Sequence, residues 1–143
     1  MWQQLSADGS ISARVVSQTN TSSWAKAGVM LRQTSDPGSL YYAILVTPGN
    51  GIVVQYRKAL GGNTTQVVNI TGTVPTYLAV GRTSNSYTAY TSNDGITWTP
   101  VAGSSVTLSM SGPVLAGMAV TSHNASALST VTFDTVSVST TIP

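Results

Sequence analysis

The fold is decided by the stretch SWAKAGVMLRQTSDPGSLYYAILVTPGNGIVVQYRK, residues 23–58, in which turn sequences separate three strand-like runs. Alternation of apolar and polar residues over 24–33 predicts a strand with one buried face. Residues 41–47 are almost continuously apolar, which is typical of a strand that is buried on both faces. Residues 52–58 alternate again, and the Asp-Pro-Gly and Pro-Gly-Asn-Gly sequences between the runs favour turns. The stretch therefore predicts three successive β-strands.

Runs of the same character fill the rest of the chain. They cover residues 11–19, 65–70, 77–82, 87–92, 96–101, 106–110, 114–122 and 129–138. Turn residues separate these runs, and helical periodicity is almost absent. About eleven short strands at this spacing indicate an antiparallel β-sandwich or barrel. With 143 residues, no linker and no internal repeat, residues 1–143 are expected to form one all-β domain.

Charged residues are scarce and scattered. They make up 7% of the chain, Glu is absent, and the net charge is +2. Nucleic-acid binders need clustered Lys and Arg, whereas only Arg57 and Lys58 are adjacent here. No apolar run approaches the length of a membrane span, and no signal-peptide pattern is present. We expect a mature product or an excised piece with no nucleic-acid partner, no membrane insertion and, because Cys is absent, no disulfides.

Asp94 lies in TSNDGITWT, residues 91–99, between two alternating runs. Asn, Asp and Gly tolerate the positive φ of a hairpin corner, and an Asp carboxylate can accept backbone N–H groups within its own turn. The stretch also resembles the Asp box of sialidases and other β-proteins, with one residue missing between Asp and Gly, and that box is structural. We therefore predict a turn residue rather than a metal ligand or a catalytic carboxylate, with Trp98 packed beside the hairpin.

The remaining candidates for catalysis are few. The acidic residues are Asp8, Asp36, Asp94 and Asp134. A glycosidase normally needs two neighbouring carboxylates, the strand–turn–helix elbow of a Ser/His/Asp hydrolase is absent, and one His without Cys or Glu leaves no zinc set. We predict that the chain is not an enzyme and has no catalytic residues, no metal and no cofactor. A calcium site with Asp134 as its first ligand stays open as an alternative.

The alternation places the most promising polar residues on one sheet face. Lys26 and Arg32 share one side of their strand, and Gln55 and Arg57 share one side of theirs. Arg32, Gln55 and Arg57 are therefore our first candidates for contact with a ligand. His123 and Asn124, in a polar loop after a long strand, are the second candidates. His123 is open to two interpretations, a structural hydrogen bond to backbone or a ligand contact.

Three stretches resemble a known family: SWAKAGVMLRQTSDPGSLYYAILVTPGNGIVVQYRK, YLAVGRTSNSYTAYTSNDGITWTPV and AGMAVTSHNASALSTVTFDTVSV. They are similar to bacterial concanavalin A-like lectin/glucanase-fold modules of the DUF1349-related type, which are attached to secreted hydrolases and surface proteins. The resemblance implies a jelly-roll sandwich of two antiparallel sheets, an extracellular location and a non-catalytic role, usually carbohydrate binding. Family members carry early strands before the segment that matches residues 1–18, so the sandwich is expected to lack them.

Two functions remain in competition. The first is a secreted, non-catalytic module that binds polysaccharide or another glycan. The second is a self-assembling structural subunit of an extracellular fibre or surface layer, joined by strand addition through the terminal strands. An uncovered sheet edge is a template for pairing with another chain, and this chain has few charges with which to protect one.

Overall fold

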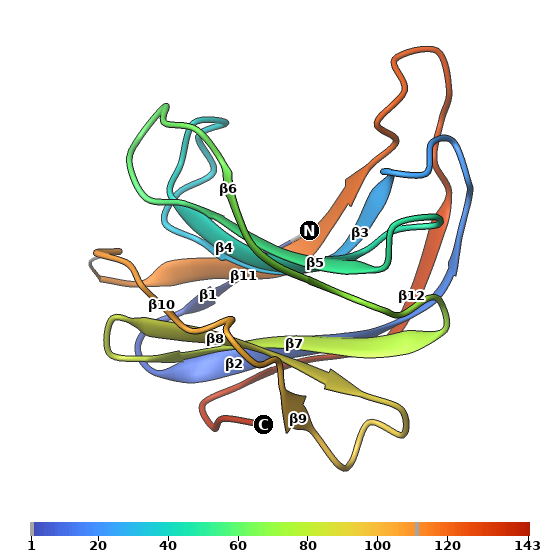
Figure 1. Ribbon diagram of the computed structural model, residues 1–143. Helices are drawn as coiled ribbons and strands as arrows, with labels where there is room; N and C mark the ends of the chain where they lie inside the picture. Colours follow the sequence, from blue (N-terminus) through green and yellow to red (C-terminus); the bar gives the residue numbers. More distant parts are fainter. Residues whose placement is uncertain (1, 111) are drawn as a thin grey trace.

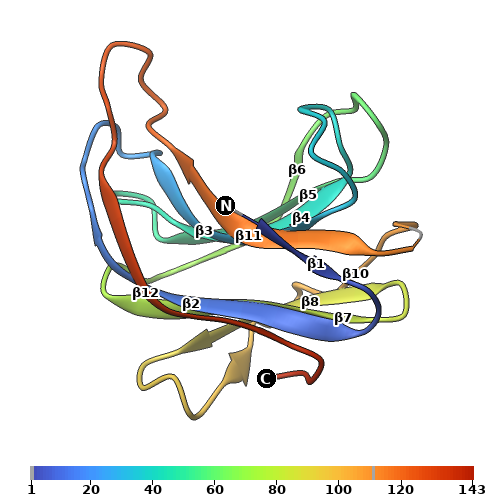
Figure 2. The same ribbon diagram turned by 180° about the vertical axis from the view of Figure 1, so that it is seen from behind.

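The chain folds into two packed antiparallel β-sheets of six strands each in a computed structural model that describes residues 2–110 and 112–143 (Figures 1 and 2). The first sheet has the order β1 (Trp2–Leu5), β11 (Val114–Thr121), β3 (Lys26–Arg32), β4 (Tyr41–Val46), β5 (Ile52–Arg57) and β6 (Thr65–Ile70). The second has the order β10 (Val106–Thr107), β8 (Ser86–Ser92), β7 (Thr76–Thr83), β2 (Gly9–Gln18) and β12 (Val131–Ser139), and β9 (Thr99–Pro100) also pairs with β8. The predicted all-β jelly-roll sandwich is confirmed.

The strands differ from the sequence prediction mainly at the sheet edges. The predicted strand over 96–101 shrinks to β9, and the one over 106–110 shrinks to β10. Both pair only with β8 and only over two positions, so few backbone groups are fixed there. β1 was not predicted, because its sequence WQQL buries only Leu5 and shows no alternation. None of the described residues forms a helix that could cross a membrane.

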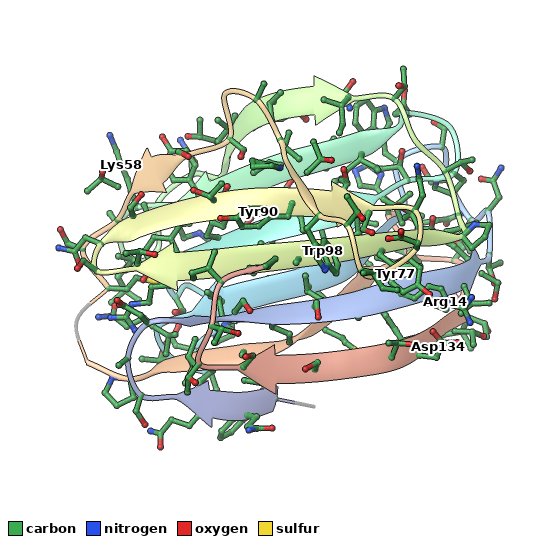
Figure 3. The ribbon with its side chains drawn as sticks, turned by 90° about the horizontal axis from the view of Figure 1, so that it is seen from below. Arg14, Lys58, Tyr77, Tyr90, Trp98 and Asp134 are labelled. Atoms are coloured by element: carbon green, nitrogen blue, oxygen red, sulfur yellow. The ribbon has the colours of Figure 1, made fainter. Side chains whose placement is uncertain are left out.

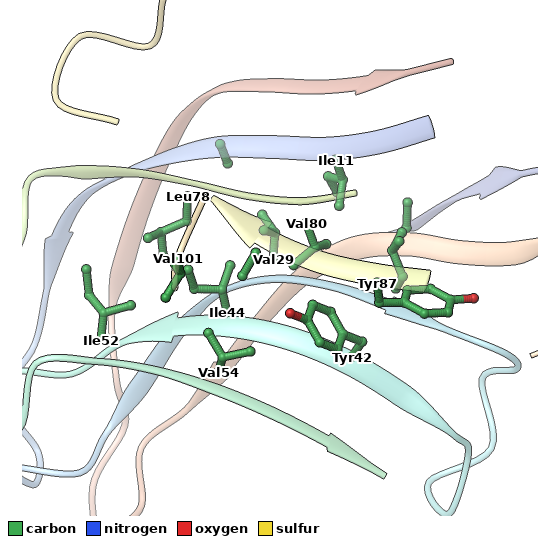
Figure 4. Close-up of a cluster of buried hydrophobic side chains, with 14 of the residues drawn as sticks. Ile11, Val29, Tyr42, Ile44, Ile52, Val54, Leu78, Val80, Tyr87 and Val101 are labelled. Carbon is green, nitrogen blue, oxygen red and sulfur yellow. The ribbon is translucent and has the colours of Figure 1, made fainter. Parts of the chain in front are cut away.

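The main core lies between the two sheets (Figure 4). Ile44 of β4 faces Leu78 and Val80 of β7, and all three side chains are fully buried. Tyr42 and Tyr87 stack at a tilt with 5.8 Å between ring centroids, and the Tyr42 hydroxyl donates to the buried carbonyl of Ser104 at 2.6 Å. Burial raises the pKa of both tyrosines. The apolar residues whose alternation predicted β3, Ala27, Val29 and Leu31, lie in this core.

A second, smaller cluster lies on the opposite, outer face of the first sheet. Tyr41, Ala43 and Leu45 of β4 pack there with Val53 of β5, and Met30 and Ala119 lie against them. β4 is therefore buried on both faces, as its continuous apolar sequence predicted. These side chains cover part of the outer face of the first sheet.

The two terminal strands are edge strands. β1 ends the first sheet beside β11, and β12 ends the second sheet beside β2. β12 is irregular, with register shifts on either side of Asp134 and a positive φ of 51° at Thr135. A bulged edge is a poor template for a further strand.

Candidate functional site

The outer face of the first sheet lies between two raised walls of loops. Loops 33–40 and 58–64 rise at one end of β3, β4 and β5, and loops 19–25 and 122–130 rise at the other (Figure 1). In the first wall, the Gly61 amide donates to the Gly38 carbonyl at 2.8 Å. In the second, the Thr21 hydroxyl donates to the Ser122 carbonyl at 2.6 Å. Each wall is thus two loops joined by hydrogen bonds.

Between the walls the sheet carries an open pocket of about 430 Å³. Polar or charged side chains and apolar ones line it in similar numbers. They are Lys26, Met30, Arg32, Pro37, Tyr41, Leu45, Gln55, Arg57, Met118, Ala119, Val120 and Thr121. Such a mixture, an apolar floor with a few directed polar groups, is typical of ligand sites.

Strand register explains why the predicted candidates Arg32, Gln55 and Arg57 meet. Arg32 pairs with Tyr41, and Tyr41 pairs with Arg57, so these residues form a row across β3, β4 and β5. Gln55 is two positions from Arg57 and so shares its face. The structure therefore brings the three residues together, as the alternation predicted, whereas their role in binding stays a prediction.

The two arginines build the first wall. Arg32 donates from Nε to the Thr34 carbonyl at 2.7 Å and from Nη2 to the Asp36 carbonyl. Arg57 donates from Nε to the Gly62 carbonyl at 2.9 Å and from Nη1 to the Pro37 carbonyl at 2.9 Å. Both side chains are held rigidly by neutral carbonyl groups. Arg57 Nη2 has no hydrogen bond within the described part of the chain, so it can donate to a ligand.

Aromatic rings support two of the cations. The Arg57 guanidinium lies over Tyr41, with 5.3 Å between Cζ and the ring centroid. The Lys26 ammonium lies 5.5 Å from the ring centroid of Trp24 and donates to the Trp24 carbonyl at 3.2 Å. Partial burial lowers the pKa of Lys26. Both contacts are cation–π interactions, which fix the cation and occupy a ring face.

His123 and Asn124 lie in the second wall and are not among the lining residues of the pocket. The Asn124 side chain donates to the Thr21 carbonyl at 3.1 Å and accepts from the Ser126 amide at 3.0 Å. His123 has a φ of 53°, and its backbone amide donates to the Thr121 hydroxyl at 3.3 Å. The structure thus separates these two candidates from the arginine cluster and places them at the other end of the face.

The list of first candidates did not include Tyr41, Thr121 or Lys26, all of which line the pocket. Thr121 reaches it because β11 pairs with β3, which is far away in the sequence, and no local pattern reveals that pairing. Tyr41 sits in a continuous apolar run, which does not say which side chains face outward. Lys26 could have been added, because alternation already placed it on the face of Arg32.

Asp94 is a turn residue, as predicted. Its Oδ1 accepts the amides of Ile96 and Thr97, both at 2.8 Å, and the Ser92 hydroxyl at 2.9 Å. These N–H groups of Ile96 and Thr97, followed by Ser92, lower the pKa of the carboxyl. The turn is wider than the expected tight hairpin, because residues 93–98 separate β8 from β9. Trp98 packs edge-on against Tyr77, with 6.4 Å between centroids (Figure 3).

Asp134, the first candidate for a calcium ligand, instead pairs with Arg14 on the second sheet (Figure 3). Arg14 Nε donates to Asp134 Oδ1 at 2.7 Å, and Nη2 donates to Oδ2. This contact lowers the pKa of Asp134. Among residues 2–110 and 112–143, no three His, Cys, Asp or Glu side chains gather closely enough to hold a metal ion.

Comparisons with known proteins define the class of fold. The sequence matches no family model and no curated protein. Among solved structures it is similar to a functionally unknown protein from Saccharomyces cerevisiae, with a TM-score of 0.70, 20% identity and coverage of 100% of this chain and 75% of that one. It is also similar to a mutant of the GH43 protein BlXynB from Bacillus licheniformis, with a TM-score of 0.65, 13% identity and coverage of 88% of this chain but 26% of that one. The chain is therefore a β-sandwich protein.

The chain is also similar to scytalido-glutamic peptidase, with a TM-score of 0.48, 14% identity and coverage of 96% of this chain and 79% of that one. The prediction that the chain is not an enzyme is corrected by the likeness to the GH43 glycoside hydrolase, because this fold is not confined to non-catalytic proteins. The prediction rested on the absence of neighbouring carboxylates, of a nucleophile elbow and of a zinc set, and these absences do not exclude catalysis. At these identities the likeness shows the fold alone and assigns no reaction to the chain.

Proposed function

We propose that the chain binds polysaccharide on the outer face of the first sheet, between the two loop walls. One observation carries the proposal: directed polar side chains from β3 and β5 converge over an apolar floor in an open pocket of about 430 Å³. Sugar rings present both apolar faces and hydroxyl groups, so a floor of this kind with hydrogen-bonding groups at its rim suits them. An open trough also admits a chain rather than only its end.

The polar groups of this face are held in place before any ligand arrives. Gln55 Nε2 donates to the Tyr41 hydroxyl at 3.0 Å, which itself bonds Thr64 at 2.7 Å. The Gln55 carbonyl oxygen accepts no hydrogen bond from the described residues and is available to a sugar hydroxyl. Side chains fixed in this way lose little conformational entropy on binding.

The finer resemblance noted in the sequence, to bacterial concanavalin A-like modules, supports the same proposal. Modules of that kind are extracellular, and polysaccharides are abundant there. We therefore place the function outside the cell.

Affinity electrophoresis against a panel of soluble polysaccharides tests the proposal. Retardation by at least one member is expected, and Gln55→Ala and Arg57→Ala should weaken it about tenfold, a change of roughly 1.4 kcal/mol. Gln4→Ala, which changes an exposed residue of β1, is the matched control and should leave it unchanged. If Arg57→Ala leaves a demonstrated affinity intact, the site lies elsewhere and the loop of His123 and Asn124 is tested next.

A second candidate function, self-association, is favoured by the edge at β1. Trp2 is 60% exposed, and with Val136 and Met118 it lines a small hollow between the two sheets. The outer side of β1 pairs with no strand among the described residues. Because β12 is bulged, β1 is the edge that we propose for strand addition to a second copy.

A further inference from the structure

The cations of this protein are concentrated at the proposed site. Lys26, Arg32 and Arg57, half of the six Lys and Arg residues in the chain, line the pocket, and none of the four Asp residues lines it. From this asymmetry, and resting on the proposed function, we infer that the polysaccharide is acidic and carries carboxylate or sulfate groups on its sugars.

The acidic side chains are engaged elsewhere. Asp134 pairs with Arg14, the one ion pair among the described residues. Asp94 accepts amides within its own turn, and Asp8 accepts the Ser84 amide at 2.8 Å. Asp36 precedes the lining residue Pro37, but its carboxylate accepts the Gly38 amide at 2.7 Å, and Arg32 contacts only its backbone carbonyl. The charges of the pocket are thus not neutralised by ion pairs.

Stacking on an exposed ring, which would serve neutral sugars equally well, is restricted here. Tyr41 is 7% exposed and lies beneath Arg57. Trp24 is 36% exposed but does not line the pocket, and Lys26 lies over its ring. A cation therefore lies over each of these rings, and cations recognise carboxylate and sulfate through charge-assisted hydrogen bonds.

The spacing of the cations favours a polymer. Lys26 and Arg32 lie at opposite ends of β3, which places them roughly 20 Å apart along the strand. Arg57 lies at the same end of the sheet as Arg32, in the row of paired residues that crosses β3, β4 and β5, and adds a third positive charge to the pocket. This separation is longer than one sugar ring, so a single acidic sugar cannot reach both ends, whereas a chain with repeated anionic groups can.

Matched pairs of polysaccharides test the inference. Isothermal titration of the full chain uses polygalacturonate against its fully methyl-esterified form, and dextran sulfate against dextran. At least one acidic member should bind about tenfold more tightly than its neutral partner, and the pair that responds distinguishes carboxylate from sulfate. Lys26→Gln should reduce that affinity about tenfold, while Lys58→Gln, which removes the same charge from an exposed residue outside the pocket, should change it little.

The other possible results of the titration distinguish failure of the inference from failure of the proposed function. Equal binding to acidic and neutral members overturns the inference and leaves the proposed function standing. Binding to no polysaccharide in the panel removes both. Equally tight binding to inorganic polyphosphate also overturns the inference, because charge without sugar would then suffice, and equal losses in Lys26→Gln and Lys58→Gln would show that the pocket is not the site.

Discussion

The guanidinium of Arg57 lies over the ring of Tyr41, with 5.3 Å between Cζ and the ring centroid. Tyr41 therefore supports a cation from below instead of offering its ring to a ligand. Its hydroxyl contacts Thr64 and Gln55, so the same side chain joins the floor of the pocket to loop 58–64. If the proposed function holds, this face should recognise its ligand through charge and hydrogen bonding rather than stacking.

Graded substitution of Tyr41 tests that support. Tyr41→Phe keeps the ring beneath Arg57 and removes the hydroxyl bonds, so the free energy of unfolding should fall by about 1 kcal/mol. Tyr41→Ala also removes the buried ring and should cost about 3 kcal/mol. Urea unfolding measures both. If Tyr41→Ala is no more costly than Tyr41→Phe, the ring does not hold the floor together.

Packing on the outer face should contribute to stability as a core does. Val53 is fully buried there, on the side of β5 that points away from the second sheet. Val53→Ala should lower the free energy of unfolding by about 2 kcal/mol. Leu60→Ala is the control, because Leu60 is 71% exposed and should change stability by less than about 0.5 kcal/mol. Equal effects of the two substitutions would mean that the outer cluster is not packed.

Local sequence patterns predicted much of this fold, because the alternation of apolar and polar residues indicates which side chains of a strand are buried. In β3, alternate residues point into the core, and the same alternation in β3 and β5 placed Arg32 and Arg57 on the outer face. Pairing between distant strands leaves no such pattern, so the contribution of Thr121 through β11 was not predictable. Edge strands such as β1 lack a buried face and were missed for that reason. The prediction that the chain is not an enzyme was wrong, because amino-acid content alone does not determine whether a protein of this fold is catalytic.

Acid should destabilise the turn of Asp94. Its pKa is lowered in the folded chain, so the carboxylate stabilises the fold above its ordinary value of 3.8, and that contribution disappears as the pH falls through the lowered value. Melting temperatures should therefore be steady near neutrality and fall below about pH 4. The Asp94→Asn variant should have a lower melting temperature at neutral pH than the native chain, and its melting temperature should fall less on acidification. Asp134, whose pKa is also lowered, should account for part of the fall that remains. Parallel acid profiles for the two proteins would contradict this origin.

Self-association, if β1 mediates it, should be sensitive to charge at that edge. Trp2→Lys places a cation on the exposed edge strand, which disfavours pairing with another strand. Sedimentation velocity at micromolar concentration should show association in the native chain and a monomer in the variant. The control is Ile96→Lys, which adds the same charge to an exposed turn residue of the second sheet. A native chain that sediments as a monomer removes this candidate function.

The most direct measurement is an NMR titration of the isotopically labelled chain with oligosaccharides of whichever acidic polysaccharide, polygalacturonate or dextran sulfate, binds more tightly in the isothermal titration. Because the outer face of the first sheet is the proposed site, saturable shifts should appear at the backbone amides of β3, β4, β5 and β11, including Lys26, Arg32 and Arg57. They should weaken when salt is added, since exposed charges are screened. Saturable shifts confined to the second sheet, around Arg14 and Asp134, would contradict the account.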